Sequence, residues 1–306
     1  MILINSLNEF VGKDDLKQNL QIYLNSSKQS NEPLEHCLFY GLPGTGKTTL
    51  AKIIAHELET KIRIVQGSSL QKPIDVINLL LSINEKDIVF IDEIHAVNKI
   101  CFELFYSAME EHKLDINIGK DFNTKITRID LPKFTLIAAT TSLGKIPQPL
   151  EDRFGIIFNL NEYSDEEIKS ITHLYADKFN LDLSNVDIES IAKASKGIPR
   201  ICVRIIKRLN DFIKTKTNLS VNEILKRLGY IYNEYDIFDK KYLLSLKNQH
   251  QPIGLKTISQ MINIDPLTIE LKIEPYLLTQ KLIIKTCQGR IITIKGLQIL
   301  KCLENS

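Results

Sequence analysis

The sequence lacks paired cysteines and long hydrophobic runs, and each absence excludes a class of protein. Its five cysteines are dispersed and form no C-x-x-C pair: Cys37, Cys101, Cys202, Cys287 and Cys302. This spacing argues against a zinc site and against a disulfide framework. No apolar run approaches the ~18 residues of a membrane-spanning helix, and residues 1–7 are too short and uncharged for a secretory signal. We therefore expect a cytoplasmic protein.

The chain also has little net charge. Its 39 lysines and arginines against 37 aspartates and glutamates leave a formal charge of +2, which provides no global basic field for nucleic acid. Residues 236–306 nevertheless carry 10 Lys and Arg against 6 Asp and Glu, so any nucleic-acid contact is expected there. The length of 306 residues predicts two or three domains of ordinary globular composition.

A phosphate-binding loop is the strongest signal that is present. An apolar strand, a glycine-bearing loop and a helix start follow one another around residues 41–48, which match the full G-x-x-x-x-G-K-[ST] pattern. Gly44 and Gly46 allow backbone conformations that point successive N–H groups at phosphate oxygens. In such a loop Lys47 neutralises the β- and γ-phosphates, and Thr48 holds Mg²⁺ through its hydroxyl. The alternative is a glycine-rich turn with a chance lysine, and the flanking strand and helix argue against it.

The second half of an ATPase site follows in residues 87–95. This apolar strand ends in Asp92, which can hold the Mg²⁺ water shell, and Glu93, which can orient and deprotonate the attacking water. Buried strands also end in solvated acids for no catalytic reason, but the pairing with the phosphate loop favours the catalytic interpretation. We interpret His95 as a packing residue behind this site.

Further candidate elements lie between residues 114 and 153. Two alternating runs over residues 114–130 predict a β-hairpin, which is either a docking surface or an ordinary surface hairpin. A buried strand at residues 134–141 ends in the hydroxyls of Thr140 and Thr141, which could touch a γ-phosphate or the attacking water. Arg153 follows on a short turn.

From Ser164 the pattern becomes helical, beginning with a capping box between Ser164 and Glu167. The helices are expected to reach about residue 178 and then to span residues 187–195, 199–212 and 222–230. Arg200 lies in the first turn of one of them, where a cation opposes the helix macrodipole. Arg200 is therefore expected to serve a ligand phosphate.

A winged-helix pattern follows residue 236. Three helices are expected at 239–248, 255–263 and 267–278, and two strands at 281–286 and 290–295. The wing carries four basic residues: Lys281, Lys285, Arg290 and Lys295. They suit phosphate contact rather than base readout, because no cluster of Asn or Gln accompanies them. Solvated charge on a small protein-protein module is the alternative.

The order of these features resembles an AAA+ ATPase. More specifically, residues 110–158 are similar to the RuvB family of bacterial Holliday-junction branch-migration motors, and shorter C-terminal segments share this similarity: 197–200, 252–255, 268–270, 274–277 and 289–290. The resemblance implies an α/β fold with three domains. These are an AAA+ P-loop ATPase domain with a parallel sheet and the inserted hairpin (1–160), a helical lid domain (161–235) and a C-terminal winged-helix DNA-binding domain (236–306).

The resemblance also implies individual roles. Lys47, Asp92 and Glu93 are catalytic together with Arg153, the arginine finger that acts on the neighbouring subunit's nucleotide. Thr141, or Thr140, is the first sensor, and Arg200 is the second sensor. The implied nucleotide-binding residues are Ile2, Leu3, Gly44, Gly46, Lys47, Thr48, Thr49, Glu110, Glu111, His112, Thr141, Arg153, Tyr163 and Arg200. Thr48 and Asp92 hold the metal, so the implied cofactors are ATP and Mg²⁺, and Lys285 and Arg290 bind DNA.

The implied function is a hexameric motor that hydrolyses ATP to drive branch migration of Holliday junctions in recombination and DNA repair. Its implied partners are duplex DNA, junction DNA and RuvA, which would dock on the hairpin, with the RuvC resolvase as a further candidate and no membrane. One alternative is a clamp-loader or initiator-like AAA+ switch that binds ATP and DNA without processive translocation. Another is a non-enzymatic adaptor, against which the intact Lys47, Asp92, Glu93 and Arg153 argue.

Overall fold

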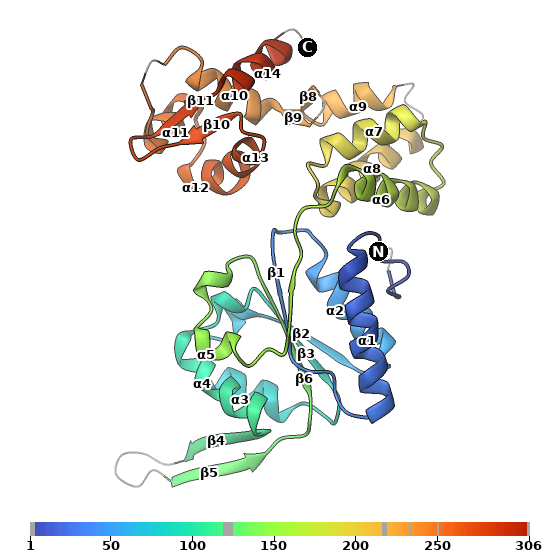
Figure 1. Ribbon diagram of the computed structural model, residues 1–306, viewed down its shortest axis with the longest axis vertical. Coiled ribbons are helices and arrows are strands. Elements are labelled where there is room, and N and C mark those ends of the chain that lie inside the picture. The colour runs from blue at the N-terminus through green and yellow to red at the C-terminus, as the bar shows by residue number, and fades with distance from the viewer. Residues whose placement is uncertain (1–3, 119–124, 216–218, 233, 250, 305–306) are drawn as a thin grey trace. The chain divides into compact units, whose positions relative to one another are not determined.

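The computed structural model describes residues 4–118, 125–215, 219–232, 234–249 and 251–304 (Figure 1). The chain divides into two compact units, Met1–Tyr163 and Ser164–Ser306. Among the described residues, no helix has the length and hydrophobicity of a membrane span.

The first unit is built on a parallel sheet. Its strands are β1 (Cys37–Tyr40), β2 (Ile62–Gln66), β3 (Ile88–Asp92), β6 (Thr135–Thr140) and β7 (Ile156–Asn159), in the order β2-β3-β6-β1-β7. Every pairing between them is parallel. The carboxyl ends of β1, β3 and β6 therefore lie side by side, which brings the phosphate loop next to the acidic strand end. The sequence prediction missed β7, a four-residue edge strand with two exposed side chains.

Helices cover both faces of this sheet (Figure 1). The helices and short 3-10 turns of this unit are α1 (Asp14–Ser30), α2 (Lys47–Glu57), η1 (Gly67–Ser69), α3 (Pro73–Leu81), η2 (Ile94–Ala96), η3 (Lys99–Cys101), α4 (Phe102–Glu110), η5 (Leu143–Lys145) and α5 (Gln148–Glu151). Alternate strand residues enter different cores: Leu38 packs with α3, α4 and α5, whereas Cys37 and Phe39 pack with α1 and α2. Burial on both faces explains why the central strands β1, β3 and β6 are largely apolar, whereas β2 and β7 at the edges carry exposed side chains.

The sequence predicts a helix within residues 9–24, after a turn at Gly12, and α1 begins at Asp14 and continues beyond that range to Ser30. Gly12 and Lys13 have φ of 77° and 54°, in the left-handed region, so the helix cannot begin before them.

The predicted hairpin is confirmed as β4 (Lys113–Ile118) and β5 (Lys125–Asp130), which pair antiparallel. Figure 1 shows these strands as a ribbon that extends away from the sheet. Asp115 lies opposite Arg128 and accepts hydrogen bonds from its Nε and Nη2 at 2.7 and 2.8 Å. The hydrogen bond from Arg128 lowers the pKa of Asp115, so the pair stays ionised near neutral pH.

The second unit begins with four helices: α6 (Asp165–Phe179), α7 (Asn185–Ala194), α8 (Pro199–Lys214) and α9 (Val221–Arg227). Ser164, Ser184 and Ser220 each form a capping box at the start of α6, α7 and α9. Such a cap satisfies two backbone donors. The box at Ser164 was recognised in the sequence, whereas α7 and α9 begin slightly before the expected residues 187 and 222, at Asn185 and Val221.

The winged helix follows in the same unit. Its elements are β8 (Tyr230–Tyr232), β9 (Tyr235–Asp236), α10 (Ile237–Leu246), α11 (Leu255–Ile262), α12 (Pro266–Thr268), the π-helical turn η6 (Ile269–Ile273), α13 (Glu274–Thr279), β10 (Ile283–Lys285), β11 (Arg290–Ile292) and α14 (Ile294–Glu304). The predicted third helix is thus three segments, because Pro275 cannot donate the backbone hydrogen bond that a continuous α-helix needs.

The predicted second wing strand at 290–295 is wrong beyond Ile292. Thr293 ends the strand and caps α14, because its Oγ1 accepts a hydrogen bond from Gly296 N at 3.0 Å. Lys295 therefore belongs to α14, where its Nζ donates to Gln280 O at 2.9 Å, and not to the wing. The β-branched run 291–294 hid this helix start from pattern reasoning.

Candidate functional site

The loop between β1 and α2 has the backbone that its glycines predict. Gly41, Gly44 and Gly46 have φ of 140°, 87° and 105°, a region that L side chains rarely adopt. A Cβ at Gly41 would lie 2.2 Å from Leu160 O, so only glycine fits there. Gly46 is the N-cap residue of α2, and it has no side chain that could accept hydrogen bonds from the backbone N–H groups of the first turn. The N–H groups of this helix start are therefore suited to bind an anion.

Lys47 and Tyr163 contact the same loop. Lys47 is only 6% exposed, and its Nζ donates to the carbonyl oxygens of Gly41 and Leu42, both at 2.8 Å. The hydroxyl of Tyr163 donates to Thr45 O at 3.0 Å. Two predicted nucleotide-binding residues from distant parts of the chain thus meet at the phosphate loop.

The candidate metal ligands lie on neighbouring elements. Thr48 and Thr49 are half-buried in the first turn of α2, and Asp92 is the last residue of β3, where Gln66 Nε2 donates to its Oδ2 at 3.4 Å. One hydroxyl and one carboxylate form a donor set that fits Mg²⁺, which takes its other ligands from phosphate and water.

The carboxylate of Glu93 is held by β6 and by His95. Thr141 donates to Glu93 Oε2 from both its backbone N and its Oγ1, each at 3.0 Å. His95 Nδ1 lies 3.2 Å from the same oxygen and 2.9 Å from Thr140 Oγ1. Both sensor candidates therefore contribute, Thr141 directly and Thr140 through His95.

The backbone at Glu93 is held by a residue that sequence reasoning missed. Glu93 has φ 52° and ψ 55°, a left-handed conformation that is costly for a residue with a Cβ. Gly67 packs against it so closely that a Cβ on Gly67 would lie 2.3 Å from Glu93 O. The signal in the sequence was a lone glycine immediately after β2, which can mark a close backbone approach.

Arg153 forms a second polar group with the end of α4. Its Nη2 donates to Glu110 Oε2 at 2.8 Å and its Nη1 to Pro149 O at 2.5 Å, while its guanidinium lies 4.8 Å from the ring centre of Tyr106. A pocket of about 320 Å³ adjoins it, with these polar lining residues: Glu32, Glu35, His36, His112, Lys133 and Arg153.

Two nitrogens in this pocket's lining are buried without a hydrogen-bond partner among the described residues. They are Nε of Arg153 and Nδ1 of His112. A buried donor without a partner is costly, so this pocket wall is suited to a polar ligand. Glu111 instead points to the hairpin, with its Oε2 3.9 Å from Arg128 Nη1.

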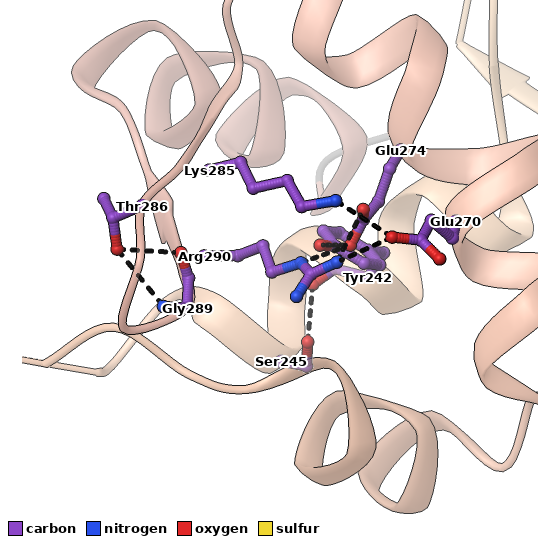
Figure 2. Close-up of polar contacts among 8 residues, drawn as sticks. All are labelled: Tyr242, Ser245, Glu270, Glu274, Lys285, Thr286, Gly289 and Arg290. Atoms are coloured by element: carbon purple, nitrogen blue, oxygen red, sulfur yellow. Dashed lines mark hydrogen bonds and ion pairs between the residues drawn. The ribbon is translucent and has the colours of Figure 1, made fainter. Parts of the chain in front are cut away.

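In the winged helix, Arg290 is buried and Lys285 is exposed. Figure 2 shows both side chains with their acidic partners Glu274 and Glu270. Arg290 Nε and Nη2 donate to Glu274 Oε1 and Oε2 at 2.7 and 3.1 Å, and the Tyr242 hydroxyl donates to Glu274 Oε1 at 2.8 Å. Lys285 Nζ donates to Glu270 Oε1 at 2.9 Å, an oxygen that is also 3.7 Å from Arg290 Nη2. Arg290 thus connects β11 to α13, whereas Lys285 lies in a surface pair.

Three protein-family models match the chain in order. They are the Holliday junction DNA helicase RuvB P-loop domain over residues 3–160, the RuvB AAA lid domain over residues 163–228 and the RuvB C-terminal winged helix domain over residues 235–301. The Holliday junction branch migration complex subunit RuvB of Ureaplasma parvum serovar 3 is 49% identical over 296 residues, 96% of this chain and 95% of that protein. The chain belongs to the RuvB family.

Other RuvB proteins agree with this assignment. The Holliday junction branch migration complex subunit RuvB of Mycoplasma genitalium is 45% identical over 296 residues, which covers 97% of this chain and 96% of that protein. A solved structure of the Thermotoga maritima RuvB Holliday junction branch migration motor has a TM-score of 0.82 at 37% identity and covers 97% of both chains. The sequence-based recognition of RuvB and its α/β AAA+ fold are therefore confirmed. The chain is an AAA+ P-loop ATPase of this family.

The structure brings several of the RuvB-type site residues together within the first unit. Lys47, Asp92, Glu93 and Thr141 lie at adjacent strand ends, and Arg153 groups with Glu110 and His112. Arg200 is exposed in the first turn of α8, in the other unit. Ile2 and Leu3 lie outside the described residues. The individual roles of all these residues stay predictions.

Proposed function

We propose that this chain is the ATP-driven motor subunit that moves Holliday-junction branch points during recombination and DNA repair, as a homo-hexameric ring acting with RuvA. The observation that carries the proposal is the group formed by Lys47, Asp92, Glu93 and Thr141 at adjacent strand ends, in a chain that RuvB-family models match from residue 3 to residue 301. Action on chromosomal DNA places the protein in the cytoplasm, as the sequence predicts.

The chemistry proposed for the first unit is hydrolysis of the γ-phosphate. A water oxygen attacks the phosphorus, the bond to ADP breaks, and the water proton goes to the carboxylate of Glu93. Thr141 and His95 orient that carboxylate by holding its Oε2. Lys47 offsets the charge of the β- and γ-phosphates. When bound at Thr48 and Asp92, Mg²⁺ neutralises charge on the phosphate oxygens.

Arg153 is proposed to complete the site of a neighbouring subunit. The unpartnered Nε of Arg153 and Nδ1 of His112 support a polar ligand at this pocket, and the RuvB resemblance identifies that ligand as the neighbour's nucleotide. Glu110 holds Arg153 at 2.8 Å and is 64% exposed, so a phosphate can exchange for it with little cost in desolvation. An arginine finger of this kind accelerates hydrolysis roughly 10³- to 10⁵-fold.

DNA and RuvA are assigned to other surfaces. We place duplex DNA on the wing, through Lys285 and with Arg290 behind it, and RuvA on β4 and β5. RuvC remains a further candidate partner of the assembled complex. A clamp-loader-like switch without processive translocation is the alternative function.

Mixed subunits test the shared site. Glu93→Gln removes the proton acceptor but leaves Arg153 intact, whereas Arg153→Ala has the opposite defect. Each variant alone should lose roughly 10³-fold in steady-state phosphate release, and mixing the two should restore part of it. Arg208→Ala, which removes an exposed arginine that pairs with the exposed Asp211 within α8, is the matched control and should be near wild type. Unchanged turnover in Arg153→Ala, or no recovery on mixing, would contradict the shared site.

A junction assay separates the motor from the switch. A four-way junction is incubated with RuvA, this protein and ATP, and strand separation is followed on a gel. The motor should separate the arms in proportion to ATP hydrolysed, and Glu93→Gln should not. Binding without separation would favour the clamp-loader-like alternative.

A further inference from the structure

Lys196 lies in the turn between α7 and α8 and makes a buried ion pair with α10. Its side chain is 12% exposed, and its Nζ contacts Asp239 Oδ2 at 2.5 Å and Asp236 Oδ2 at 3.6 Å. The same ammonium lies 4.8 Å from the ring centre of Tyr276 in α13. Asp239 is only 1% exposed, so this contact is shielded from water on the carboxylate side.

This pair differs from the other lysine pairs of the same helical segment. Lys193 pairs with Glu189 within α7 at 2.8 Å, but their side chains are 38% and 51% exposed, and such pairs contribute little. Burial raises the pKa of Asp239 to about 6, and Lys196 opposes that rise. Lys196 also brings a cation to the start of α10, where the macrodipole alone disfavours it. The two carboxylates are therefore what hold Lys196 in place.

The Lys196–Asp239 contact is connected to the wing strand β11 through neighbouring residues of α10 and α13. Tyr242, one turn after Asp239 in α10, donates to Glu274 in α13, and Glu274 accepts from Arg290 in β11 (Figure 2). Tyr276 follows Glu274 by two residues in the same helix. Lys196 and the Tyr242–Glu274 hydrogen bond therefore both join α10 to α13. Through Glu274 and Arg290, α13 in turn holds β11, which pairs with the strand β10 that carries Lys285.

The same contact is connected to Arg200 through the backbone turn that precedes α8. Lys196 and Gly197 both have left-handed backbones, with φ of 50° and 70°, and Ile198 N donates to Ser195 O at 2.9 Å. Ser195 is fully buried, and its Oγ donates to Ile191 O at 2.6 Å. Lys196 lies in this tight turn, and Arg200 lies in the first turn of the helix α8 that follows it. A displacement of Arg200 on nucleotide binding should therefore displace Lys196 as well.

We propose that Lys196 is a positioning residue that couples nucleotide contact at Arg200 to DNA contact at the wing, through Asp239 and Tyr276. The proposal rests on the proposed function, which assigns DNA to the winged helix, and on the sequence-based prediction that Arg200 is the second sensor of the nucleotide. Nucleotide and DNA then raise each other's affinity by the same factor, because linkage is reciprocal.

The test measures that coupling factor in the full-length protein. Binding of a fluorescein-labelled duplex DNA of random sequence is titrated with and without Mg²⁺ and ATPγS, and the two dissociation constants are divided. The wild type should give a factor of about 10, within the usual range for coupled sites. Lys196→Met should bring it to about 1 while leaving nucleotide-free DNA affinity within about twofold. Asp239→Asn should do the same, and Lys196→Arg should keep the coupling.

Lys193→Met is the matched control, since it removes a lysine from an exposed pair in α7. Its coupling factor should equal that of the wild type. A wild-type factor in Lys196→Met would overturn the inference, as would equal weakening of DNA binding with and without nucleotide, which indicates a purely structural role. A wild-type protein that binds no DNA, or shows no coupling, would overturn the proposed function as well.

Discussion

At the scale of single residues, the proposed catalytic geometry depends on the contacts that hold Glu93 in place. Glu93 has an unfavourable backbone, and its carboxylate is oriented by Thr141 and His95. Gly67 makes that backbone possible by approaching the Glu93 carbonyl closely. The arrangement concentrates strain at a functional position and holds it there with neighbouring packing.

Gly67→Ala should disable the site without changing any reacting group. Gly67 has no positive φ, so the alanine is accepted by the backbone but its Cβ would lie 2.3 Å from Glu93 O. Such overpacking costs about 1–3 kcal/mol and should displace Glu93, so phosphate release should fall at least about tenfold. Gly144→Ala is the control, because its Cβ would meet nothing within 4 Å. Normal turnover in Gly67→Ala would show that Glu93 does not depend on this contact.

At the scale of elements, buried polar groups connect strands and helices that the sequence leaves far apart. In the first unit, His36 bridges α4 and β6 just before β1. Its Nε2 donates to Met109 O at 3.2 Å, and its Nδ1 accepts from Leu136 N at 2.9 Å. In the second unit, Glu274 and Arg290 connect α13 to β11. Each of these contacts should contribute to the free energy of unfolding.

The His36 contact makes the stability of the first unit depend on pH. Because Nδ1 accepts a backbone hydrogen bond, the ring is neutral, and burial lowers its pKa from 6.5 to about 4. Between pH 6.5 and 4 the unfolded chain binds a proton that the native state does not. The unfolding free energy should therefore fall as the pH is lowered through this window, by at most about 1.4 kcal/mol per pH unit.

Urea unfolding at several pH values checks this, with His36→Gln as the comparison. Glutamine keeps a donor and an acceptor but does not titrate, so the variant should lose this part of the pH dependence. Identical slopes for the two proteins would mean that His36 is not the group responsible.

Glu274→Gln should destabilise the winged helix strongly. Glu274 is 1% exposed and holds both Arg290 and Tyr242, so its neutralisation leaves a buried guanidinium without a counter-charge. Breaking a buried pair in this way costs about 3–5 kcal/mol, which urea unfolding would measure. Glu270→Gln alters the exposed pair with Lys285 and a longer contact of 3.7 Å with Arg290 Nη2, while Glu274 still pairs with Arg290, so it should change stability little. Equal effects of the two substitutions would contradict the structural role of Arg290.

At the scale of the whole molecule, the proposed chemistry requires assembly. Lys47, Glu93 and Thr141 are proposed to act on the phosphates bound by their own subunit, whereas Arg153 and His112 are proposed to act on a neighbour's site. The ATP turnover of each subunit should therefore depend on whether it is assembled with neighbouring subunits.

ATP turnover per subunit should rise with protein concentration and then reach a plateau. Because Arg153 supplies roughly 10³-fold or more of the rate, turnover at dilution should approach that of Arg153→Ala, whose own rate should not change with concentration. Phosphate release and sedimentation, measured over the same concentrations, check this. A strictly monomeric preparation with full activity would refute the dependence on assembly.

Local sequence patterns were sufficient for the strands β1, β3 and β6, the capped helix α6, the hairpin β4–β5 and the phosphate loop, because each is specified by residues close together in the chain, whereas the parallel sheet was implied by the RuvB resemblance. They were insufficient where neighbours in space decide the outcome. The edge strand β7 depends on its pairing with β1. The start of α14 at Thr293 and the break of the third helix at Pro275 are local features that pattern reasoning overlooked. The contacts of Gly67 with Glu93, Lys196 with Asp239 and Arg290 with Glu274 join residues 26, 43 and 16 positions apart in sequence. No periodicity encodes such distances, so only tertiary packing determined which polar groups meet and which of them are kept from water.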